Sequence, residues 1–509
     1  MSQVQRKKRQ RRRQGSAGRV ALVTILVTVI GLAIASLALV GYVVGIAASA
    51  PSLDSLTPNP KGSLSVVYAN DGSRLGFIQS DELRTPIPAQ DMPQSLKDAT
   101  VAIEDQRFYK HKGVDFEGVI RAALKNIESK KAVQGGSTIT MQLIRNLYIS
   151  NERRTFKRKV REAKLAEELE NEHPGRPGKA WILAKYLNTV PYGTVGGQSA
   201  IGIQAAARIF FDTTAGKLTV PQSALLAGLP QAPSIYNPFL NPSGALRRRN
   251  EVIRKMADLG YIQPETAQRA LAAPLGVTHS RYYNARRESY FFDFVTQELI
   301  GKYGINKVRK GGLRIHTTID LTMQKAARSA MANVLNQPGD PASAIVSIDP
   351  RNGYIRAMAS SERYAKSKFN VAAQGHRQAG STFKVMVLMT ALRRGVDPER
   401  TSYVSKHLEP GWLPTAPTYE VQTYGHSYSG SMNLVSATLK SDNTVYAQLD
   451  ADLGPDAVKQ TAYDMGITTH LDGYPAEGLG GLTIGVSPLE MSDAEIGRAS
   501  CRERVSLTV

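Results

Sequence analysis

The sequence predicts a membrane-anchored chain with two folded domains, the first mainly α-helical and the second α/β. Three observations lead to this class: an uncharged apolar run near the N-terminus, helical periodicity through the first half, and alternating β-like runs beyond Pro341. A length of 509 residues exceeds one ordinary core, and 42% hydrophobic residues exclude a disordered chain. The expected fold class is therefore α + α/β multidomain.

Residues 1–19 form a basic tail that precedes an uncharged run from Val20 to Ala50. At about 1.5 Å per residue this run can cross about 30 Å of hydrocarbon. We expect residues 20–50 to be a transmembrane helix, and cleavage after Ala48-Ser49-Ala50 stays an alternative. The positive-inside rule then leaves the tail in the cytoplasm and the rest of the chain outside.

The formal net charge of +21 is compatible with nucleic-acid binding, but a basic tail next to an apolar span is better explained as a topology signal. We therefore expect no nucleic-acid partner. One cysteine, Cys501, excludes an intrachain disulfide, and the eight histidines show no metal-ligand spacing.

Residues 51–84 are expected to form a stalk and a short β segment. Two β-like runs, Leu64 to Tyr68 and Leu75 to Ile78, flank the turn Asn70-Asp71-Gly72, which is typical of a hairpin. Residues 85–275 are expected to be the helical domain. Apolar periodicity and composition predict helices over Phe116 to Ile127, Thr155 to Glu170, Ala180 to Asn188, Ile203 to Phe211, Val220 to Leu229 and Leu246 to Leu259.

Residues 276–340 are interpreted as a linker region, with a helix from Tyr290 to Tyr303 and a strand from Leu313 to Ile319. Residues 341–494 are expected to form the α/β domain. It begins with a β-hairpin over residues 344–359, and a helix runs from Ser381 to Arg394. Residues 495–509 show neither periodicity nor turn pattern. We expect them to be foreign sequence at a truncated gene end.

The first group of motifs whose side chains could take part in catalysis or binding begins at Glu104-Asp105, followed by Phe108 and His111. Paired glycines, hydroxyls and amides follow from Gly135 to Asn146. These can approach and hydrogen-bond an oxygen-rich ligand. A basic helix then places Arg158 and Glu162 on one face at i, i+4. Taken singly, such motifs usually mean a solvated loop, a turn and a surface helix.

In this order the motifs resemble the peptidoglycan glycosyltransferases of family 51, over about residues 85 to 260. The resemblance includes Tyr186 to Asn188, Gly202 to Ala207 and Leu226 to Pro238, and it departs from commoner members at Thr189 to Gly197. It implies a lysozyme-like helical fold and an enzyme that polymerises lipid II and releases undecaprenyl diphosphate.

The resemblance also assigns roles. Glu104 would be the general base for the 4-hydroxyl of lipid II, and Glu162 the second catalytic carboxylate. The implied substrate-binding residues are Asp105, Phe108, His111, Ser137, Thr138, Gln142, Arg145, Asn146, Arg158, Lys159 and Asn188. No cofactor is obligatory, but a divalent cation, Mg²⁺ or Mn²⁺, is expected to assist near Glu162.

The second group is Ser381-Thr382-Phe383-Lys384, followed by Ser441-Asp442-Asn443. A lysine three residues after a serine lies one helical turn away and can activate the hydroxyl. Both elements resemble penicillin-binding proteins and class A β-lactamases. From Arg6 to about Ala494 the chain is similar to the bifunctional class A penicillin-binding proteins.

That resemblance implies that Ser381, Lys384, Ser441 and Asn443 are catalytic in a penicillin-sensitive D,D-transpeptidase that cross-links stem peptides. A third element, Lys-Thr-Gly or Lys-Ser-Gly, does not occur in the sequence. We therefore expect an incomplete transpeptidase domain here, with its activity in the full-length parent.

Two other functions remain open. One is a non-catalytic, membrane-anchored scaffold of the cell-wall machinery, which the retained catalytic residue types disfavour. The other is hydrolysis, by a lysozyme-like glycosidase or a β-lactamase, which requires neither the anchor nor the basic helix. Expected partners are lipid II, nascent peptidoglycan, the membrane, β-lactams if the domain is complete, and other cell-wall synthesis proteins. The expected location is the bacterial cytoplasmic membrane, single-pass, with the catalytic domains on the extracytoplasmic side.

Overall fold

The computed structural model describes residues 3–58, 62–119, 121, 136–149, 153, 155–497 and 505–508. The chain divides into two compact units. The first combines Met1–Ser63 with Asp81–Tyr282, and the second combines Leu64–Ser80 with Tyr283–Val509. Each unit is therefore made from two separate stretches of the chain.

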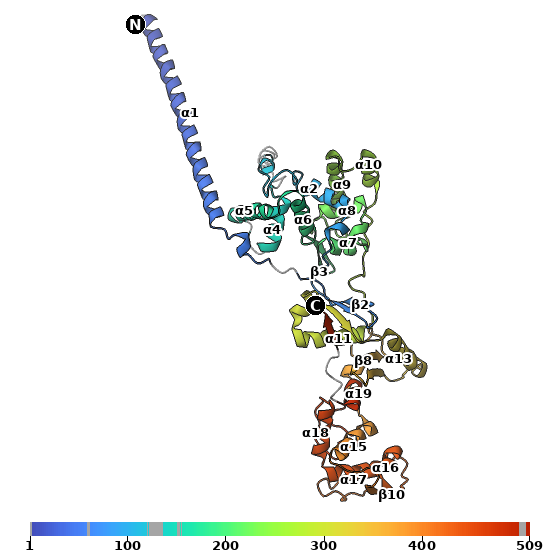
Figure 1. The fold of residues 1–509 in the computed structure, drawn as a ribbon. Coiled ribbons are helices and arrows are strands. Elements are labelled where there is room, and N and C mark those ends of the chain that lie inside the picture. Colours follow the sequence, from blue (N-terminus) through green and yellow to red (C-terminus); the bar gives the residue numbers. More distant parts are fainter. Residues whose placement is uncertain are drawn as a thin grey trace. The chain divides into compact units, whose positions relative to one another are not determined.

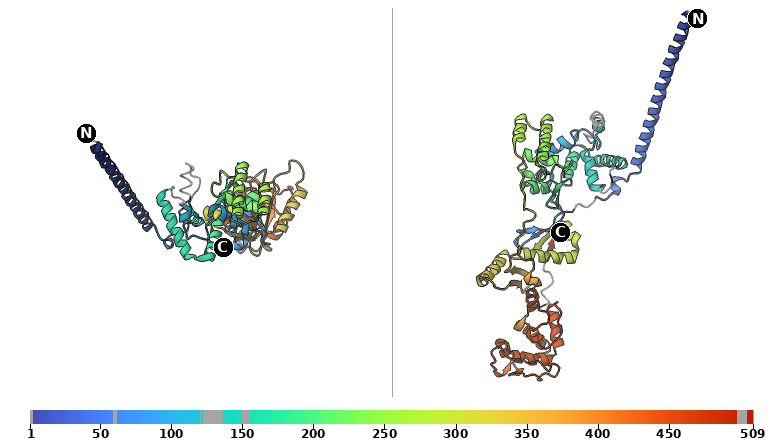
Figure 2. Two further views of the ribbon diagram at one scale, coloured as in Figure 1. Left: turned by 90° about the horizontal axis from the view of Figure 1, so that it is seen from above. Right: turned by 180° about the vertical axis from the view of Figure 1, so that it is seen from behind.

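The first unit begins with α1 (Gln3–Ala48), which Figures 1 and 2 show as one unbroken helix. Its segment Leu22–Ala48 has a mean hydropathy of 2.7 and an exposed surface. Within the described residues it is the one helix long and apolar enough to cross a membrane. The predicted apolar helix is thus confirmed.

The body of the first unit is helical, as predicted (Figure 1). Its helices are α2 (Gln94–Glu104), α4 (Ile139–Tyr148), α5 (Phe156–Glu172), α6 (Gly175–Leu187), α7 (Ile203–Phe211), α8 (Val220–Gly228), α9 (Pro242–Asp258) and α10 (Pro264–Ala272), with 3-10 turns η1 (Leu53–Ser55), η2 (Ala89–Asp91) and η3 (Ala215–Lys217). Helix α9 begins earlier than predicted, because Asn241 caps its N-terminus and Pro242 occupies the first turn. The predicted helix Phe116 to Ile127 lies largely outside the described residues.

Small side chains pack α2 against α8 and α9. Ala99 and Ala102 of α2 meet Ala224 and Ala227 of α8, and all four are buried. Because alanine side chains are small, the three helix axes approach closely and the helices pack tightly. This packing fixes the C-terminal end of α2, where Glu104 lies.

A three-stranded sheet in the order β3-β5-β4 was not anticipated from the sequence. It contains β3 (Glu82–Arg84), β4 (Pro191–Val195) and β5 (Gln198–Ile201). Strands β4 and β5 form an antiparallel hairpin, and β3 pairs parallel to β5. Gly196 and Gly197 form the turn with φ of 58° and 80°, a conformation that favours glycine.

The second unit opens with a four-stranded sheet in the order β11-β6-β1-β2. The strands are β1 (Val66–Tyr68), β2 (Arg74–Phe77), β6 (Arg314–Thr317) and β11 (Val505–Thr508). The predicted β1–β2 hairpin is confirmed, but it belongs to this unit, because β1 pairs parallel to β6 far along the chain. Residues 495–509, which we expect to be foreign sequence, contribute β11, which pairs antiparallel to β6.

The rest of the second unit is α/β. It contains α11 (Ser289–Tyr303), α12 (Ile305–Lys310), α13 (Leu321–Val334), β7 (Ala344–Asp349), β8 (Tyr354–Ser360), α14 (Val371–Gln374), η4 (Gly380–Phe383), α15 (Lys384–Arg393), β9 (Ser402–Ser405), β10 (Gly430–Asn433), α16 (Leu434–Lys440), α17 (Asn443–Leu453), α18 (Pro455–Met465), η5 (Glu477–Leu479) and α19 (Pro488–Ile496). Strands β7 and β8 form the predicted hairpin. The helix predicted from Ser381 starts as the 3-10 turn η4 and continues as α15. Phe383, Met386, Val445 and Leu449 share one buried cluster that joins α15 to α17.

Candidate active sites

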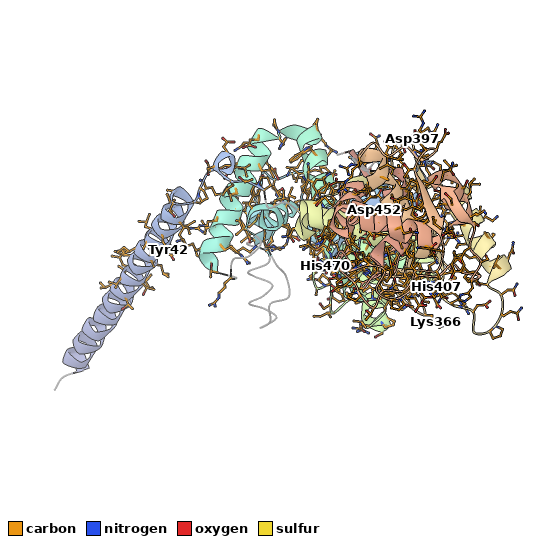
Figure 3. The ribbon with its side chains drawn as sticks, turned by 90° about the horizontal axis from the view of Figure 1, so that it is seen from below. Tyr42, Lys366, Asp397, His407, Asp452 and His470 are labelled. Carbon is orange, nitrogen blue, oxygen red and sulfur yellow. The ribbon has the colours of Figure 1, made fainter. Side chains whose placement is uncertain are left out.

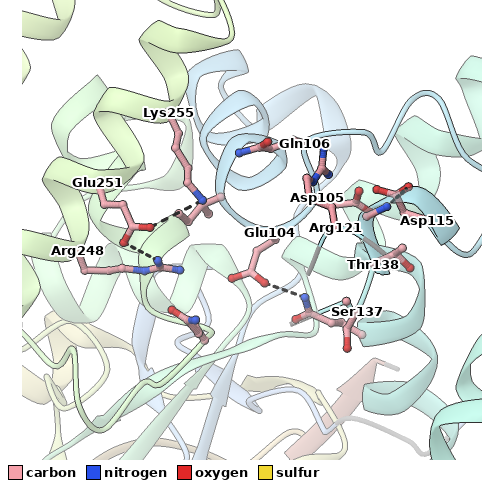
Figure 4. Close-up of a pocket in the computed structure, with 15 residues that line it drawn as sticks. Glu104, Asp105, Gln106, Asp115, Arg121, Ser137, Thr138, Arg248, Glu251 and Lys255 are labelled. Carbon is pink, nitrogen blue, oxygen red and sulfur yellow. Dashed lines mark hydrogen bonds and ion pairs between the residues drawn. The ribbon is translucent and has the colours of Figure 1, made fainter. Parts of the chain in front are cut away.

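A pocket of about 510 Å³ lies at the C-terminal end of α2. Figure 4 shows Glu104 in it, with Ser137 and Thr138 on one side and Arg248 with Lys255 on the other. Among the residues that the structure describes, the lining is Ile103, Glu104, Asp105, Gln106, Asp115, Gly118, Arg121, Gly136, Ser137, Thr138, Gln142, Gln231, Arg248, Glu251 and Lys255. Polar and charged side chains dominate this lining, which suits a ligand rich in hydroxyl and phosphate groups.

Glu104 is held by one of its two carboxylate oxygens. Gln142 Nε2 donates a 2.7 Å hydrogen bond to Glu104 Oε2, and Tyr186 OH donates to Gln142 Oε1 at 3.2 Å. Glu104 Oε1 has no hydrogen-bond partner among the described residues. Burial raises the pKa of Glu104, against the opposing effects of Gln142, Arg248 and Arg145. The carboxylate is therefore oriented and has a raised proton affinity, and its second oxygen is buried with no donor among the described residues.

The cationic wall of the pocket comes from α9. Arg248 is buried, donates from Nε to Gly228 O at 3.2 Å and contacts Glu251 Oε2 at 2.8 Å. Lys255 Nζ lies 3.7 Å from Glu251 Oε1. These three residues are not predicted from the sequence, because a basic amphipathic helix usually faces solvent. The buried position of Arg248 among three consecutive arginines becomes visible only in the fold.

Glu162 lies outside this lining, in a separate buried ion-pair group on α5. Its side chain is 0% exposed, with Arg158 Nε at 3.0 Å and Lys159 Nζ at 2.7 Å. Lys159 Nζ also donates to Ser137 Oγ at 2.5 Å, and Ser137 lines the pocket. The two predicted carboxylates therefore do not face each other directly, and Lys159 with Ser137 connects their surroundings.

Several other predicted residues meet around the pocket. Ser137, Thr138 and Gln142 line it, as does Asp105. Asp105 Oδ1 contacts His111 Nε2 at 2.9 Å, and its Oδ2 accepts from the Ile139 backbone at 3.1 Å. Asp105 thus connects the end of α2 to the start of α4 by a hydrogen bond.

Arg145 and Asn146 are adjacent on α4. The charge of Arg145 acts on Glu104, and Asn146 Nδ2 is buried with no hydrogen-bond partner in the described part of the chain. Both therefore remain candidates for contact with a ligand.

Seven predicted binding residues are not among those that line the pocket: Phe108, His111, Arg145, Asn146, Arg158, Lys159 and Asn188. Phe108 is fully buried under Lys179, whose Nζ lies 4.5 Å from the ring centroid, and His111 is buried against Asp105. Asn188 exchanges hydrogen bonds with the backbone of Ile87, at 3.0 and 2.8 Å. The contacts of Phe108, His111 and Asn188 therefore stabilise the local fold.

The second predicted site joins α15 to α17 in the second unit. Lys384 Nζ donates to Ser441 O at 2.7 Å, Ser441 Oγ at 3.0 Å and Asn443 Oδ1 at 2.8 Å. These three acceptors account for the three donors of an ammonium group. Ser381 is exposed on η4, and no hydrogen bond joins it to Lys384, in contrast to the contact expected from sequence.

Burial lowers the pKa of Lys384 to about 8, although the charge of Asp442 opposes the shift. Asp442 caps α17 by accepting from the Thr444 and Val445 amides, and this cap fixes Asn443 at the helix start. Lys384 can therefore exist as a neutral amine near neutral pH, beside two polar side chains and one turn from an exposed serine.

Comparison with known proteins agrees with this division into two sites. A family described as "Transglycosylase" matches residues 71–257, and one described as "Penicillin binding protein transpeptidase domain" matches residues 343–493. The crystal structure of Penicillin-Binding Protein 1A from Haemophilus influenzae is similar in fold, with a TM-score of 0.52 at 19% identity. The match covers 86% of this chain and 68% of that chain.

Two sequence relatives define the family. Penicillin-binding protein 2D of Bacillus subtilis is 35% identical, over 84% of this chain and 61% of the relative. Penicillin-binding protein 1A of Aquifex aeolicus is 30% identical, over 87% of this chain and 70% of the relative. The chain thus spans 61% and 70% of the length of these two relatives. With both domains and both site groups present, the protein belongs to the class A penicillin-binding proteins.

Proposed function

We propose that this protein is a membrane-anchored peptidoglycan synthase in which Glu104 is the general base of lipid II polymerisation. The observation that carries the proposal is the state of Glu104. One oxygen is fixed by Gln142, the other has no partner among the described residues, and burial raises the pKa. A carboxylate with raised proton affinity is suited to receive a proton during bond formation.

In this mechanism the 4-hydroxyl of lipid II donates its proton to Glu104 Oε1 while its oxygen attacks C1 of the growing glycan. The bond from C1 to the diphosphate oxygen breaks, and the electron pair leaves with undecaprenyl diphosphate. Arg158 and Lys159 would face the departing negative charge, and Glu162 holds both cations in place. Glu162 therefore acts as a positioning residue in this account.

The divalent cation expected near Glu162 remains a prediction, and the surroundings of Glu162 do not fit it. Both carboxylate oxygens face a cationic group, Arg158 on one side and Lys159 on the other. A further positive ion there would be repelled. No step of the proposed mechanism uses a metal at that position.

The second unit supports a serine acyl-transfer activity on stem peptides. Ser381 Oγ would attack the carbonyl between two terminal D-alanines, and the Lys384 group, with Ser441 beside it, would accept the serine proton. The peptide C–N bond breaks and D-alanine leaves with that proton. An amine of a second stem peptide then displaces Ser381 and forms the cross-link.

The anchor supports a membrane location. We propose that the basic tail is cytoplasmic and both catalytic units extracytoplasmic at the bacterial cytoplasmic membrane, where a lipid-linked donor is available. Other cell-wall synthesis proteins are the proposed protein partners.

The test of the polymerase is the length of the glycan made from lipid II in vesicles. The wild-type protein should lengthen glycan chains, and Glu104→Gln should reduce the rate by at least about a hundredfold. Glycan shortening would identify a hydrolase instead. A wild-type protein that neither lengthens nor shortens glycan would support a scaffold, and equal lengthening by Glu104→Gln would exclude Glu104 as the base.

A fluorescent penicillin tests the second site. Covalent labelling of the protein that is lost in Ser381→Ala and kept in Thr382→Ala would support Ser381 as nucleophile. Labelling that persists in Ser381→Ala would exclude it.

A further inference from the structure

The end of α1 is held by two oppositely charged side chains of α5. Lys164 Nζ donates to the carbonyls of Ala50 at 3.0 Å and Pro51 at 3.4 Å. Glu168 Oε2 accepts from the Leu53 amide at 2.9 Å, and Lys164 pairs with Glu168 at 3.3 Å. We call these five residues the α1–α5 clasp.

Each charge in the clasp meets a backbone group of complementary polarity. Backbone carbonyl oxygens carry partial negative charge and accept hydrogen bonds, whereas backbone amides carry partial positive charge and donate them. An ammonium group next to the carbonyls and a carboxylate next to the amide are therefore the favourable arrangement. Ala50 and Leu53 are each 6% exposed, so these bonds border a packed apolar contact.

A ring contact extends this attachment toward the membrane segment. Tyr42, labelled on α1 in Figure 3, stacks on Phe156 of α5 with ring centroids 6.3 Å apart. Helix α5 therefore contacts α1 through its first residue, and it contacts the residues that follow α1 through Lys164 and Glu168.

A second face of α5 carries the residues proposed to bind diphosphate. Arg158 and Glu162 are buried on that face, whereas Lys164 and Glu168 are partly exposed. Lys159 and Lys164 are separated by about 7.5 Å along the helix axis. The position where the apolar helix ends is thus coupled, through one rigid helix, to the group around Lys159.

The diphosphate of a polyprenyl-linked sugar lies at the level of the lipid headgroups, which is also where an apolar helix ending at Ala48 leaves the hydrocarbon. We propose that Lys164 and Glu168 are positioning residues that hold α5 at the membrane depth of the substrate's diphosphate. This inference rests on the proposed function, and it adds a role for residues that touch no substrate.

The kinetic test compares two substrates. For Lys164→Met and Glu168→Ala, we expect the KM for long-chain lipid II in vesicles to rise about three- to tenfold, since hydrogen bonds to charged groups are lost, with kcat unchanged. The KM for a short-chain, water-soluble lipid II analogue should not change, because that substrate has no fixed depth. Lys164→Arg should restore the wild-type KM, and Lys157→Met, an exposed lysine of the same helix, serves as the matched control.

A structural test is independent of catalysis. In lipid nanodiscs, Glu168→Ala should accelerate hydrogen exchange of the Leu53 amide about tenfold, because that amide loses its acceptor. Exchange in α8 should stay as in the wild type.

Three outcomes would overturn the inference: an unchanged KM for the long-chain substrate, an equal rise for both substrates, or unchanged exchange at Leu53. Glu104→Gln separates this failure from failure of the proposed function. If Glu104→Gln is inactive on both substrates while the clasp variants behave as wild type, only the positioning role is wrong. An active Glu104→Gln would contradict the proposed function itself.

Discussion

Burial changes the proton affinity of several single side chains in this protein, and the direction differs with their chemistry. It raises the pKa of the carboxylic acids Glu104 and Asp450 and lowers the pKa of the amine Lys384. The cause is shared, because a low-dielectric surrounding disfavours the charged form of each group. Two of these residues belong to the proposed sites, and the third is structural.

Lys384 should make acylation dependent on pH. Because burial lowers its pKa from 10.5 to about 8, the neutral amine that can accept the Ser381 proton accumulates as the pH rises through 8. The rate of labelling by a fluorescent penicillin should therefore rise between about pH 7 and 9 and then level. A rise centred near 10.5 would show that the pKa of Lys384 is not lowered, and a rate that does not change with pH would show that Lys384 is not the acceptor.

Asp450 should reduce stability at neutral pH. It is 1% exposed, neither carboxylate oxygen has a hydrogen-bond partner among the described residues, and burial with the nearby charge of Glu477 raises its pKa from 3.8 to about 7. Between these values the unfolded chain is ionised and the folded chain protonated, so stability falls as the pH rises from about 4 to 7. We expect Asp450→Asn to raise the free energy of unfolding by about 1–3 kcal/mol at pH 8.

Chemical denaturation at pH 4 and pH 8 measures this difference. The gain from Asp450→Asn should be small at pH 4, where the folded protein is protonated and the unfolded chain is only partly ionised. An equal gain at both pH values would contradict the assignment.

At the scale of elements, the turn that carries Ser381 depends on a glycine contact. Gly480 has a φ of 82°, and a Cβ atom there would lie 2.0 Å from Gly380 O. The short turn η5 therefore packs directly on the backbone next to Ser381. Gly480→Ala should lower the free energy of unfolding by about 2 kcal/mol or more and displace that turn.

Thermal unfolding and penicillin labelling of Gly480→Ala check this contact together. Gly411→Ala is the matched control, because Gly411 also has positive φ but nothing lies within 4 Å of its Cβ position. Equal losses in both variants would assign the effect to backbone conformation alone.

The sequence predicts the longer elements well. Helix α7 has the predicted bounds Ile203–Phe211, because its apolar residues follow helical spacing and Asp212 ends it in the left-handed conformation. The hairpin of β4 and β5 was missed. Gly193, Gly196 and Gly197 within a few residues are typical of a loop, and only pairing with β3 makes the segment a sheet.

The candidate sites, too, are predicted from local motifs but not where tertiary packing decides the position of a side chain. Ser137, Thr138 and Gln142 belong to a recognisable motif next to Glu104, and the structure brings all of them to one pocket. Arg248 and Lys255 were missed, because the direction in which a basic helix face points depends on tertiary packing. Periodicity shows that such a face is polar but not what it faces.

At the scale of the whole molecule, the chain builds each unit from distant segments. Residues 64–80 lie between the two stretches of the first unit in sequence, but they complete the sheet of the second unit through β6. Local pattern can predict the β1–β2 hairpin, but it cannot reveal a parallel partner about 250 residues later. Long-range pairing of this kind leaves no local signal.

A substitution at Val67 tests whether β1 belongs to the second unit. It is 0% exposed, and it pairs with Gly76 and Ile315 in the sheet. Val67→Asp buries an unpaired charge and should destabilise the second unit by about 3 kcal/mol or more. Hydrogen exchange should accelerate in β6 and α11 but not in α2 and α8. Acceleration in α2 and α8 instead would place β1 with the first unit.

The central claim, that Glu104 is the base of a lipid-linked sugar transfer, is tested most directly by the pH dependence of polymerisation in vesicles. Activity should fall on the acid side at a pH above the usual Glu pKa of 4.5, because burial raises the pKa of Glu104 and its ionised form is required. Arg248→Met removes a charge that lowers this pKa, so the acid limb should move to higher pH. An acid limb that stays in place in Arg248→Met, or that persists in an active Glu104→Gln, would contradict the account.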